Sequence, residues 1–177
     1  KCRLFFIGDV DQLPSVGAGQ FLKDLIESGV ADVGRLTEVF RQARRSRIVM
    51  NAHRIRAGEW PALKPPPDDR PTDFYFVERE NPLDVQSLVI QVVRERIPER
   101  FKLDPFRDIQ VLSPMYRGTA GVDALNTALQ ESLNSNSPEY RVGQRLIRIG
   151  DRVMQLSNNY QKRVFNGDIG RVVTFGS

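Results

Sequence analysis

The fold of this chain is decided by residues 4–16, which read LFFIGDVDQLPSV. Four apolar residues that end at a glycine and an aspartate predict a buried parallel strand leading into a loop. In an open α/β sheet, ligands bind beyond the carboxyl ends of the strands, where this loop would lie. The carboxamide of Gln12 can both donate and accept hydrogen bonds, so it could hold a water or a phosphate oxygen. A helix-capping loop with solvated carboxylates would explain the same residues.

Strand-like and helix-like segments alternate from this stretch to about residue 135, which predicts an α/β doubly wound fold with a parallel sheet. Beyond residue 146 the pattern becomes β-rich, with a turn expected at Asn166-Gly167. Residues 60–73 hold five prolines and are expected to form an extended linker. We expect strands at 4–7, 34–40, 74–77, 109–112, 147–156 and 171–175, and helices at 20–27, 46–58, 82–97 and 122–133.

The composition is that of an ordinary globular protein, with 177 residues, 40% hydrophobic and 27% charged residues, and a net charge of +4. Only five of its 26 basic residues are lysine, and arginine suits phosphate and base stacking better. A genome rich in arginine codons would give the same bias. The single cysteine excludes an internal disulfide and a zinc cluster, which fits the cytoplasm. No apolar run reaches the roughly 18 residues of a membrane span.

A second motif, LTEVFRQ, covers residues 36–42. Arg41 ends an apolar segment, so its guanidinium would project from a strand end towards a crevice. That position suits an arginine finger, which stabilises charge on a transferring phosphoryl group. The alternative is that Arg41 is one of several surface arginines, together with Arg44, Arg45 and Arg47.

A third motif, VLSPMYRGTAGV, covers residues 111–122 and places a loop between a strand and a helix. Its hydroxyls, arginine and glycines could hold the phosphates of a nucleic-acid backbone. Tyr116 and Arg117 could also stack on an unpaired base. An ordinary strand-to-helix turn, with Pro114 and Gly118 as its turn residues, is the alternative.

A fourth motif, GDRVMQLSNNY, covers residues 150–160 and is followed by VFNGDIG at 164–170. Paired asparagines beside a tyrosine offer hydrogen bonds and a stacking face for a single strand. Asn158 and Asn159 could instead simply turn a hairpin.

Together these four segments resemble the motifs of RecD-like superfamily 1 DNA helicases, and the resemblance extends from residue 4 to about residue 173. It implies that Gln12 senses the γ-phosphate of ATP, that Asp9 supports the Gln12 loop, and that Arg41 contacts the γ-phosphate. It also implies contacts with single-stranded DNA by eight residues: Ser113, Tyr116, Arg117, Thr119, Asn126, Asn158, Asn159 and Tyr160.

The resemblance further implies a RecA-like fold of the P-loop NTPase type. Residues 1–34 would form the end of a first motor domain, and 35–145 most of a second. Residues 146–177 would lead into an SH3-like insertion. The expected function is that of an ATP-dependent DNA helicase in recombination and repair that moves 5′ to 3′ on single-stranded DNA. ATP and Mg²⁺ would be its cofactors, and subunits of a helicase–nuclease complex its possible partners.

The chain contains no phosphate loop of the form GxxxxGK[ST] and none of the acidic pair that holds magnesium in this family. We therefore expect no metal site, and no ATP hydrolysis by this chain on its own. Two other functions remain open: a non-catalytic module that binds single-stranded nucleic acid, and a structural subunit of a helicase–nuclease complex. A phosphate loop and acidic pair in the longer protein would favour the motor.

Overall fold

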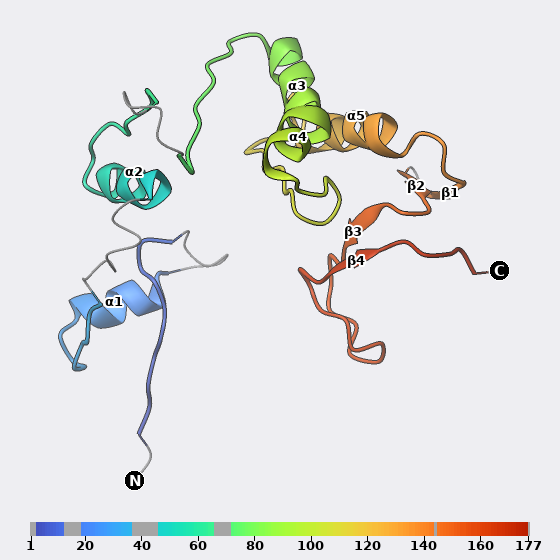
Figure 1. Cartoon of the computed structure of the whole chain (residues 1–177). Helices are drawn as coiled ribbons and strands as arrows, with labels where there is room; N and C mark the ends of the chain where they lie inside the picture. Colours follow the sequence, from blue (N-terminus) through green and yellow to red (C-terminus); the bar gives the residue numbers. More distant parts are fainter. Residues whose placement is uncertain (1–2, 13–18, 37–45, 66–71, 144, 177) are drawn as a thin grey trace. The chain divides into compact units, whose positions relative to one another are not determined.

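The structure is a computed structural model that describes residues 3–12, 19–36, 46–65, 72–143 and 145–176. It divides into two compact units, residues 1–77 and 78–177 (Figure 1). Each unit is described separately below.

The first unit contains two helices, α1 (Phe21–Glu27) and α2 (Arg47–Arg56). Both confirm the helices expected at 20–27 and 46–58. Helix α2 begins where the Ser46 hydroxyl accepts a hydrogen bond from the Val49 N–H at 3.1 Å. It ends just before Gly58, whose φ of +77° is favoured by glycine. The serine cap and the glycine stop are local signals, which is why the sequence predicts this helix well.

The strand expected at residues 4–7 is absent, because these residues form no regular element. All four side chains are exposed, and Ile7 is 98% exposed. A parallel strand exists only through hydrogen bonds with neighbouring strands, and no described segment pairs with this one. Among the described aromatic rings, Phe6 contacts Phe21 of α1 edge to face, with the ring centroids 5.4 Å apart. The expected strand at 34–40 lies partly outside the described residues, and its described part, 34–36, is irregular.

The second unit begins with a helical rod of three consecutive segments: α3 (Pro82–Gln91), a π-helical turn (Val92–Arg96) and α4 (Ile97–Phe101). Asn81 caps the rod by accepting from the Leu83 N–H, and Pro82 occupies the first helical position, as expected. Pro98 has no N–H to donate, and just before it the Ile97 N–H bonds to Val92 five residues back. This wider turn lets the helix continue to residue 101, beyond the predicted end at 97.

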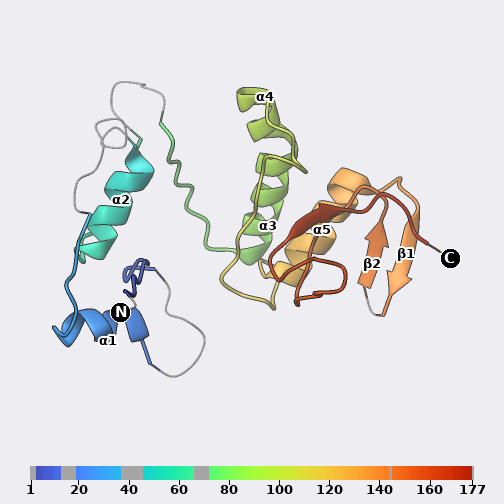
Figure 2. The ribbon, with the colours of Figure 1, turned by 90° about the horizontal axis from the view of Figure 1, so that it is seen from below.

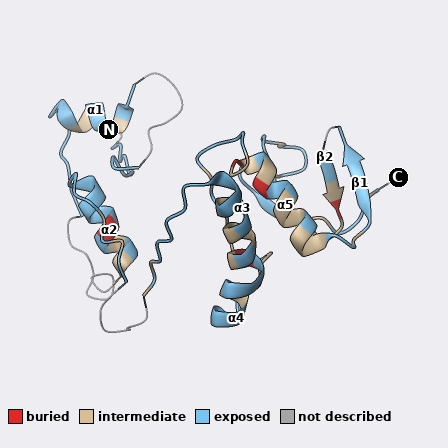
Figure 3. Cartoon of the chain, turned by 90° about the horizontal axis from the view of Figure 1, so that it is seen from above, coloured by how far each residue is buried: buried red, intermediate tan, exposed pale blue. Residues whose placement is uncertain are grey.

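Helix α5 (Val122–Asn134) confirms the helix expected at 122–133, and it packs against α3 (Figure 2). Among the described residues, only Val93, in the π-helical turn of the rod, and Leu125 of α5 are buried apolar side chains. Figure 3 shows how little of the chain is buried apart from them. Polar contacts therefore carry much of the organisation of this unit.

Two small antiparallel sheets follow α5. In the first, β1 (Glu139–Val142) pairs with β2 (Arg145–Arg148), and Tyr140 lies opposite Ile147. In the second, β3 (Arg152–Met154) pairs with β4 (Ile169–Arg171). The expected turn at Asn166-Gly167 is confirmed, because Gly167 has φ +93° and closes the β3–β4 hairpin by donating to the Gln155 carbonyl at 2.9 Å.

The α/β class is confirmed, whereas the predicted strands at 74–77 and 109–112 are irregular. Strands lie only at the C-terminal end of the described chain, and all of their pairings are antiparallel. The expected parallel sheet is therefore not formed by the described residues. The reason is the same as for residues 4–7: extended segments far apart in a chain become strands only beside their neighbours.

Candidate nucleic-acid interface

The loop that precedes α5 is closed by its own backbone and by Ser113. The hydroxyl of Ser113 lies 2.9 Å from the Ala120 carbonyl, and Gly121 donates to the Gly118 carbonyl at 2.9 Å. A Cβ atom added to Gly121 would lie 2.5 Å from the carbonyl oxygen of Arg117, so no larger residue fits there. Ser113, expected to contact DNA, is thus engaged in shaping the loop.

The start of α5 is occupied by the loop itself. The Val122 N–H donates to the Met115 carbonyl at 2.8 Å, and the Asp123 N–H donates to the Tyr116 carbonyl at 3.3 Å. Asp123 also places a carboxylate in the first turn. Because these donors are used within the chain, a phosphate at this helix end would not find them open.

Side chains therefore provide the contact surface of this loop. Tyr116 is 78% exposed, and Arg117 and Asn126 are also exposed. Thr119 is half-buried, and its carbonyl accepts a hydrogen bond from Gln86 of α3 at 2.9 Å. The rod thus holds the loop in place while Tyr116 and Arg117 project from it, as a stacking ring and a cation would in binding a single strand.

The tip of the β3–β4 hairpin, residues 155–168, is organised by the two asparagines of the fourth motif. Asn159 pairs with Val164 through two backbone hydrogen bonds, and its side chain accepts from the Lys162 N–H at 3.0 Å. The Asn158 side chain accepts from the Asn166 N–H at 2.8 Å. Both side chains serve the turn, which is the alternative raised for them in the sequence.

Tyr160 is the exposed aromatic ring of this hairpin tip. It is 75% exposed and meets Phe165 edge to face at 6.0 Å. Lys162 and Arg163 follow it and are exposed. The tip thus offers one ring beside two cations, the same chemistry as Tyr116 and Arg117 in the first loop.

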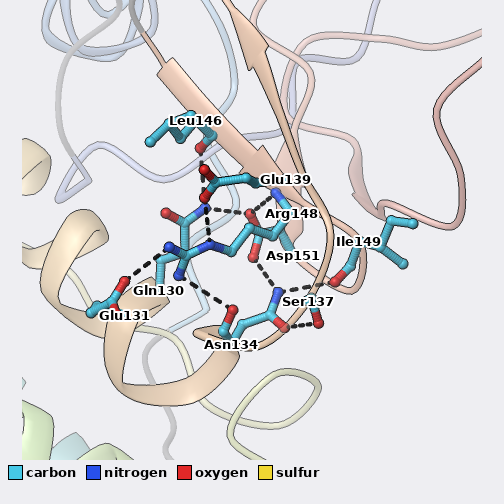
Figure 4. Close-up of polar contacts among 9 residues, drawn as sticks. All are labelled: Gln130, Glu131, Asn134, Ser137, Glu139, Leu146, Arg148, Ile149 and Asp151. Atoms are coloured by element: carbon cyan, nitrogen blue, oxygen red, sulfur yellow. Dashed lines mark hydrogen bonds and ion pairs between the residues drawn. The ribbon is translucent and has the colours of Figure 1, made fainter.

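A polar cluster at the C-terminal half of α5, drawn in Figure 4, was not predicted from the sequence. At its centre is the buried carboxylate of Asp151. It accepts hydrogen bonds from the side chains of Gln130 and Asn134 on α5, at 2.5 and 2.7 Å, and from the backbone N–H of Arg148, at 2.7 Å. Helix α5 is thereby attached to the turn between β2 and β3.

The guanidinium of Arg148 completes the cluster. It bonds Glu131 of α5 at 2.9 Å, Glu139 of β1 at 3.3 Å and the Asn134 carbonyl at 3.3 Å (Figure 4). The hydrogen bond to Glu131 raises the pKa of Arg148 above its ordinary value, against the opposing effect of burial. The sequence signal for this role was a charged residue, Arg148, within a predicted strand. The sequence could not identify its partners, because they lie far away along the chain.

A second attachment joins the hairpin to the segment before the first loop. Arg152 of β3 donates to the carbonyls of Phe106 and Ile109, at 3.3 and 2.9 Å. The guanidinium of Arg171 on β4 lies over the Phe106 ring, 5.6 Å from its centroid. These arginines are structural, so the arginine bias of the composition does not translate directly into DNA contacts.

In the first unit, residues 9–12 form a turn centred on Asp9. The Asp9 carboxylate accepts from the Asp11 N–H at 3.0 Å and from the Gln12 carboxamide at 3.2 Å. Asp11 pairs with Arg56 of α2 at 2.9 Å. Asp9 and Gln12 are thus brought together, and the Gln12 side chain is oriented by the carboxylate.

Arg41 lies outside the described residues, as does the rest of its motif beyond Leu36. Its neighbour Arg47 is described and is not a solvated surface arginine. Its guanidinium donates to the carbonyls of Ala62 and Lys64, which attaches the proline-rich segment to α2. Within the described ranges there is no group of three or more potential metal ligands. Nor does any helix described there have the length and apolar character needed to cross a membrane.

Comparison with protein families gives two matches. Residues 1–66 match an AAA domain, which places the N-terminal part of the chain in that class. Residues 125–176 match the SH3 domain of ATP-dependent RecD-like DNA helicases. This second match begins within α5 and includes the Arg148–Asp151 cluster and both sheets.

Two curated relatives align along nearly the whole chain. The ATP-dependent RecD2 DNA helicase of Deinococcus radiodurans is 33% identical over 171 residues, 97% of this chain and 22% of the relative. The RecBCD enzyme subunit RecD of Mycolicibacterium smegmatis is 29% identical over 183 residues, 98% of this chain and 32% of the relative. The chain therefore spans between a fifth and a third of these proteins. Along nearly its whole length the chain is thus similar to RecD-like helicases, as its motifs suggested.

Proposed function

We propose that this chain is the part of an ATP-dependent DNA helicase that links γ-phosphate sensing to movement along single-stranded DNA. The observation that carries the proposal is the matched chemistry of two loops in the second unit. Each presents an exposed tyrosine next to basic side chains, Tyr116 with Arg117 and Tyr160 with Lys162 and Arg163. Stacking rings combined with cations bind single strands without sequence preference, as a translocating enzyme requires.

The nucleotide-sensing role is proposed for Asp9, Gln12 and Arg41. The Asp9–Gln12 hydrogen bond at 3.2 Å supports it, because an oriented carboxamide is suited to report on a phosphate oxygen. ATP supplies the bond that is hydrolysed, and Mg²⁺ would accompany it.

The domain layout belongs to the same proposal. Residues 1–34 would complete one RecA-like motor domain, and 35–145 would form most of a second around a parallel sheet. Residues 146–177 would lead into the SH3-like insertion. Movement from 5′ to 3′ and a role in recombination and repair are proposed from the motif resemblance alone. Assembly with other subunits is proposed from the relative that is a subunit of the RecBCD enzyme.

The test is unwinding by the whole protein from which the chain comes. We expect ATP-dependent separation of a duplex with a 5′ single-stranded tail and little separation with a 3′ tail. The chain of 177 residues alone should show no ATP turnover, with or without DNA. DNA binding without any unwinding by the whole protein would favour the non-catalytic module instead. Preference for the 3′ tail would overturn the proposed direction.

A further inference from the structure

We propose that the buried Arg148–Asp151 cluster is a clamp that holds the two DNA-contacting loops at a defined separation. The inference rests on the proposed function for its DNA part, and on the contacts of the second unit for its mechanical part. The cluster itself contains no residue expected to touch DNA. Its members act as positioning residues.

The first step is that α5 connects the cluster directly to the first loop. The loop runs into the N-terminus of α5, where Gly121 leaves no room for a side chain. The other half of α5 carries Gln130, Glu131 and Asn134, the three helix residues of the cluster. A helix of 13 residues is a stiff element, so a displacement at the cluster moves the loop as well.

The second step is that the cluster connects directly to the second loop. Asp151 immediately precedes β3, whose hairpin carries Tyr160 at its tip. After β4, the Val172 N–H donates to the Asp151 carbonyl at 2.9 Å, and the Gly150 N–H donates to the Val172 carbonyl at 2.8 Å. Both legs of the hairpin are therefore attached at the residue that α5 holds.

The third step is that apolar packing contributes little to holding the hairpin in place. Among the described residues, the buried apolar side chains are Val93 and Leu125, which lie in the rod and in α5 and not in the sheets. The hairpin and the segment after it are joined to the rest of the unit by the cluster, by the Arg152 and Arg171 contacts with Phe106 and Ile109, and by the stacking of Phe175 on Tyr140 of β1. A satisfied buried polar network defines one geometry, whereas a small apolar contact would tolerate several.

The mechanical part is tested by a distance measurement that needs no DNA. Spin labels would be placed at two exposed positions, Met115→Cys in the first loop and Gln161→Cys at the hairpin tip, in a Cys2→Ser background. We expect a narrow distance distribution in the chain and a broad one in Arg148→Met. The matched control is Arg145→Met, which removes the same charge from an exposed position of the same strand and should leave the distribution narrow.

A narrow distribution in Arg148→Met would overturn the clamp, as would an equally broad one in Arg145→Met. If Arg148→Met does not fold, Glu131→Gln combined with Glu139→Gln weakens the same link from carboxylates that are 65% and 51% exposed. This double variant should also broaden the distribution, and an unchanged distribution would contradict the clamp.

The DNA part is tested by affinity for oligothymidines of about four and about sixteen nucleotides, which would engage one loop and both loops. We expect Arg148→Met to leave the short oligonucleotide unaffected and to weaken the long one about tenfold, because two linked contacts lose their effective concentration. Equal weakening of both would indicate a general structural defect and contradict the inference. Absence of binding by the unmodified chain would count against the proposed function, while the distance measurement would still decide the clamp.

Discussion

The two units differ in how they hold their candidate functional residues. In the first, Asp9 and Gln12 contact each other within a short turn, and one exposed ion pair, Asp11 with Arg56, links that turn to α2. In the second, the loop of Tyr116 is held by contacts far apart in sequence, such as Gln86 with Thr119. The turn proposed to sense the nucleotide is thus held by contacts within a few residues and by one ion pair, whereas the loop proposed to contact DNA is also held by α3.

This difference follows from the kind of structure each half needs. A γ-phosphate sensor at the end of a parallel strand requires the neighbouring strands, and residues 4–7 are exposed and form no strand in the described structure. A loop between a rod and a helix requires only those two elements, and both are present here. We therefore expect the second unit to keep its binding property in isolation, and the first to need the whole protein.

The largest effect is expected for Arg41→Ala in the whole protein. Loss of an arginine finger should reduce ATP hydrolysis by about 10³-fold or more, because charge on the transferred phosphoryl group is left unstabilised. Binding of single-stranded DNA should be spared. Steady-state hydrolysis and DNA anisotropy measure the two properties, and Arg44→Ala serves as the matched control. Unimpaired ATP hydrolysis by Arg41→Ala would contradict the proposed contact of Arg41 with the γ-phosphate.

The next largest effect is expected for Gly121→Ala, which tests whether the contacts of the second unit hold the loop before α5 in place. The added methyl would lie 2.5 Å from the Arg117 carbonyl oxygen and 2.7 Å from that of Tyr116. Such overpacking should cost about 2 kcal/mol of unfolding free energy and displace the loop, so that DNA affinity falls as well. Urea unfolding and anisotropy measure both. Gly34→Ala, where an added Cβ meets nothing within 4 Å, should be neutral.

A pair of buried polar residues compares the two units directly. Asp151→Ala removes the acceptor of three hydrogen bonds and should destabilise the second unit by about 3 kcal/mol. Asn51→Ala removes two hydrogen bonds to Ala62 in the first unit and should cost about 1 kcal/mol. Hydrogen exchange resolves the two units separately. A larger loss of stability for Asn51→Ala than for Asp151→Ala would contradict this expectation.

The smallest expected effect is a loss of stability at acidic pH, through Asp73, which accepts hydrogen bonds at the start of α2. The hydrogen bond from the Ser46 hydroxyl lowers the pKa of Asp73, and the Arg47 N–H adds to this at 2.8 Å. Because the folded pKa is lowered, the contribution to stability is present above the ordinary aspartate pKa and is lost as the pH falls through the lower folded value. Exchange at the start of α2 should rise over that interval. Asp73→Asn should remove the dependence, and an unchanged dependence would contradict this assignment.

The sequence predicted the helices well because their signals are local. Ser46, Pro82 and Gly58 mark helix ends through the conformations that they favour by themselves. The turn at Asn166-Gly167 was found for the same reason. The parallel strands were not formed, since a strand at 4–7 or 109–112 depends on partners that no short window of sequence contains.

The candidate site was predicted in part. Motif resemblance selected the loops of Tyr116 and Tyr160, and the structure shows both rings exposed. It did not foresee that Ser113 would use its side chain within the loop, whereas a turn-forming role for Asn158 and Asn159 was the alternative considered for them. It also could not find the Arg148–Asp151 cluster. The partners of that cluster come from a helix and two strands, and only the folded chain brings them together.

We propose that the second half of this chain binds single-stranded DNA through specific side chains. The most direct measurement is fluorescence anisotropy of a labelled oligothymidine, titrated with the chain at several salt concentrations. We predict saturable binding that weakens steeply with salt. Arg117→Ala should weaken it further and reduce the slope of log affinity against log salt by about 0.7, one phosphate contact on a single strand. Binding with the same affinity and slope in Arg117→Ala would contradict the claim, because only general attraction to a basic protein would remain.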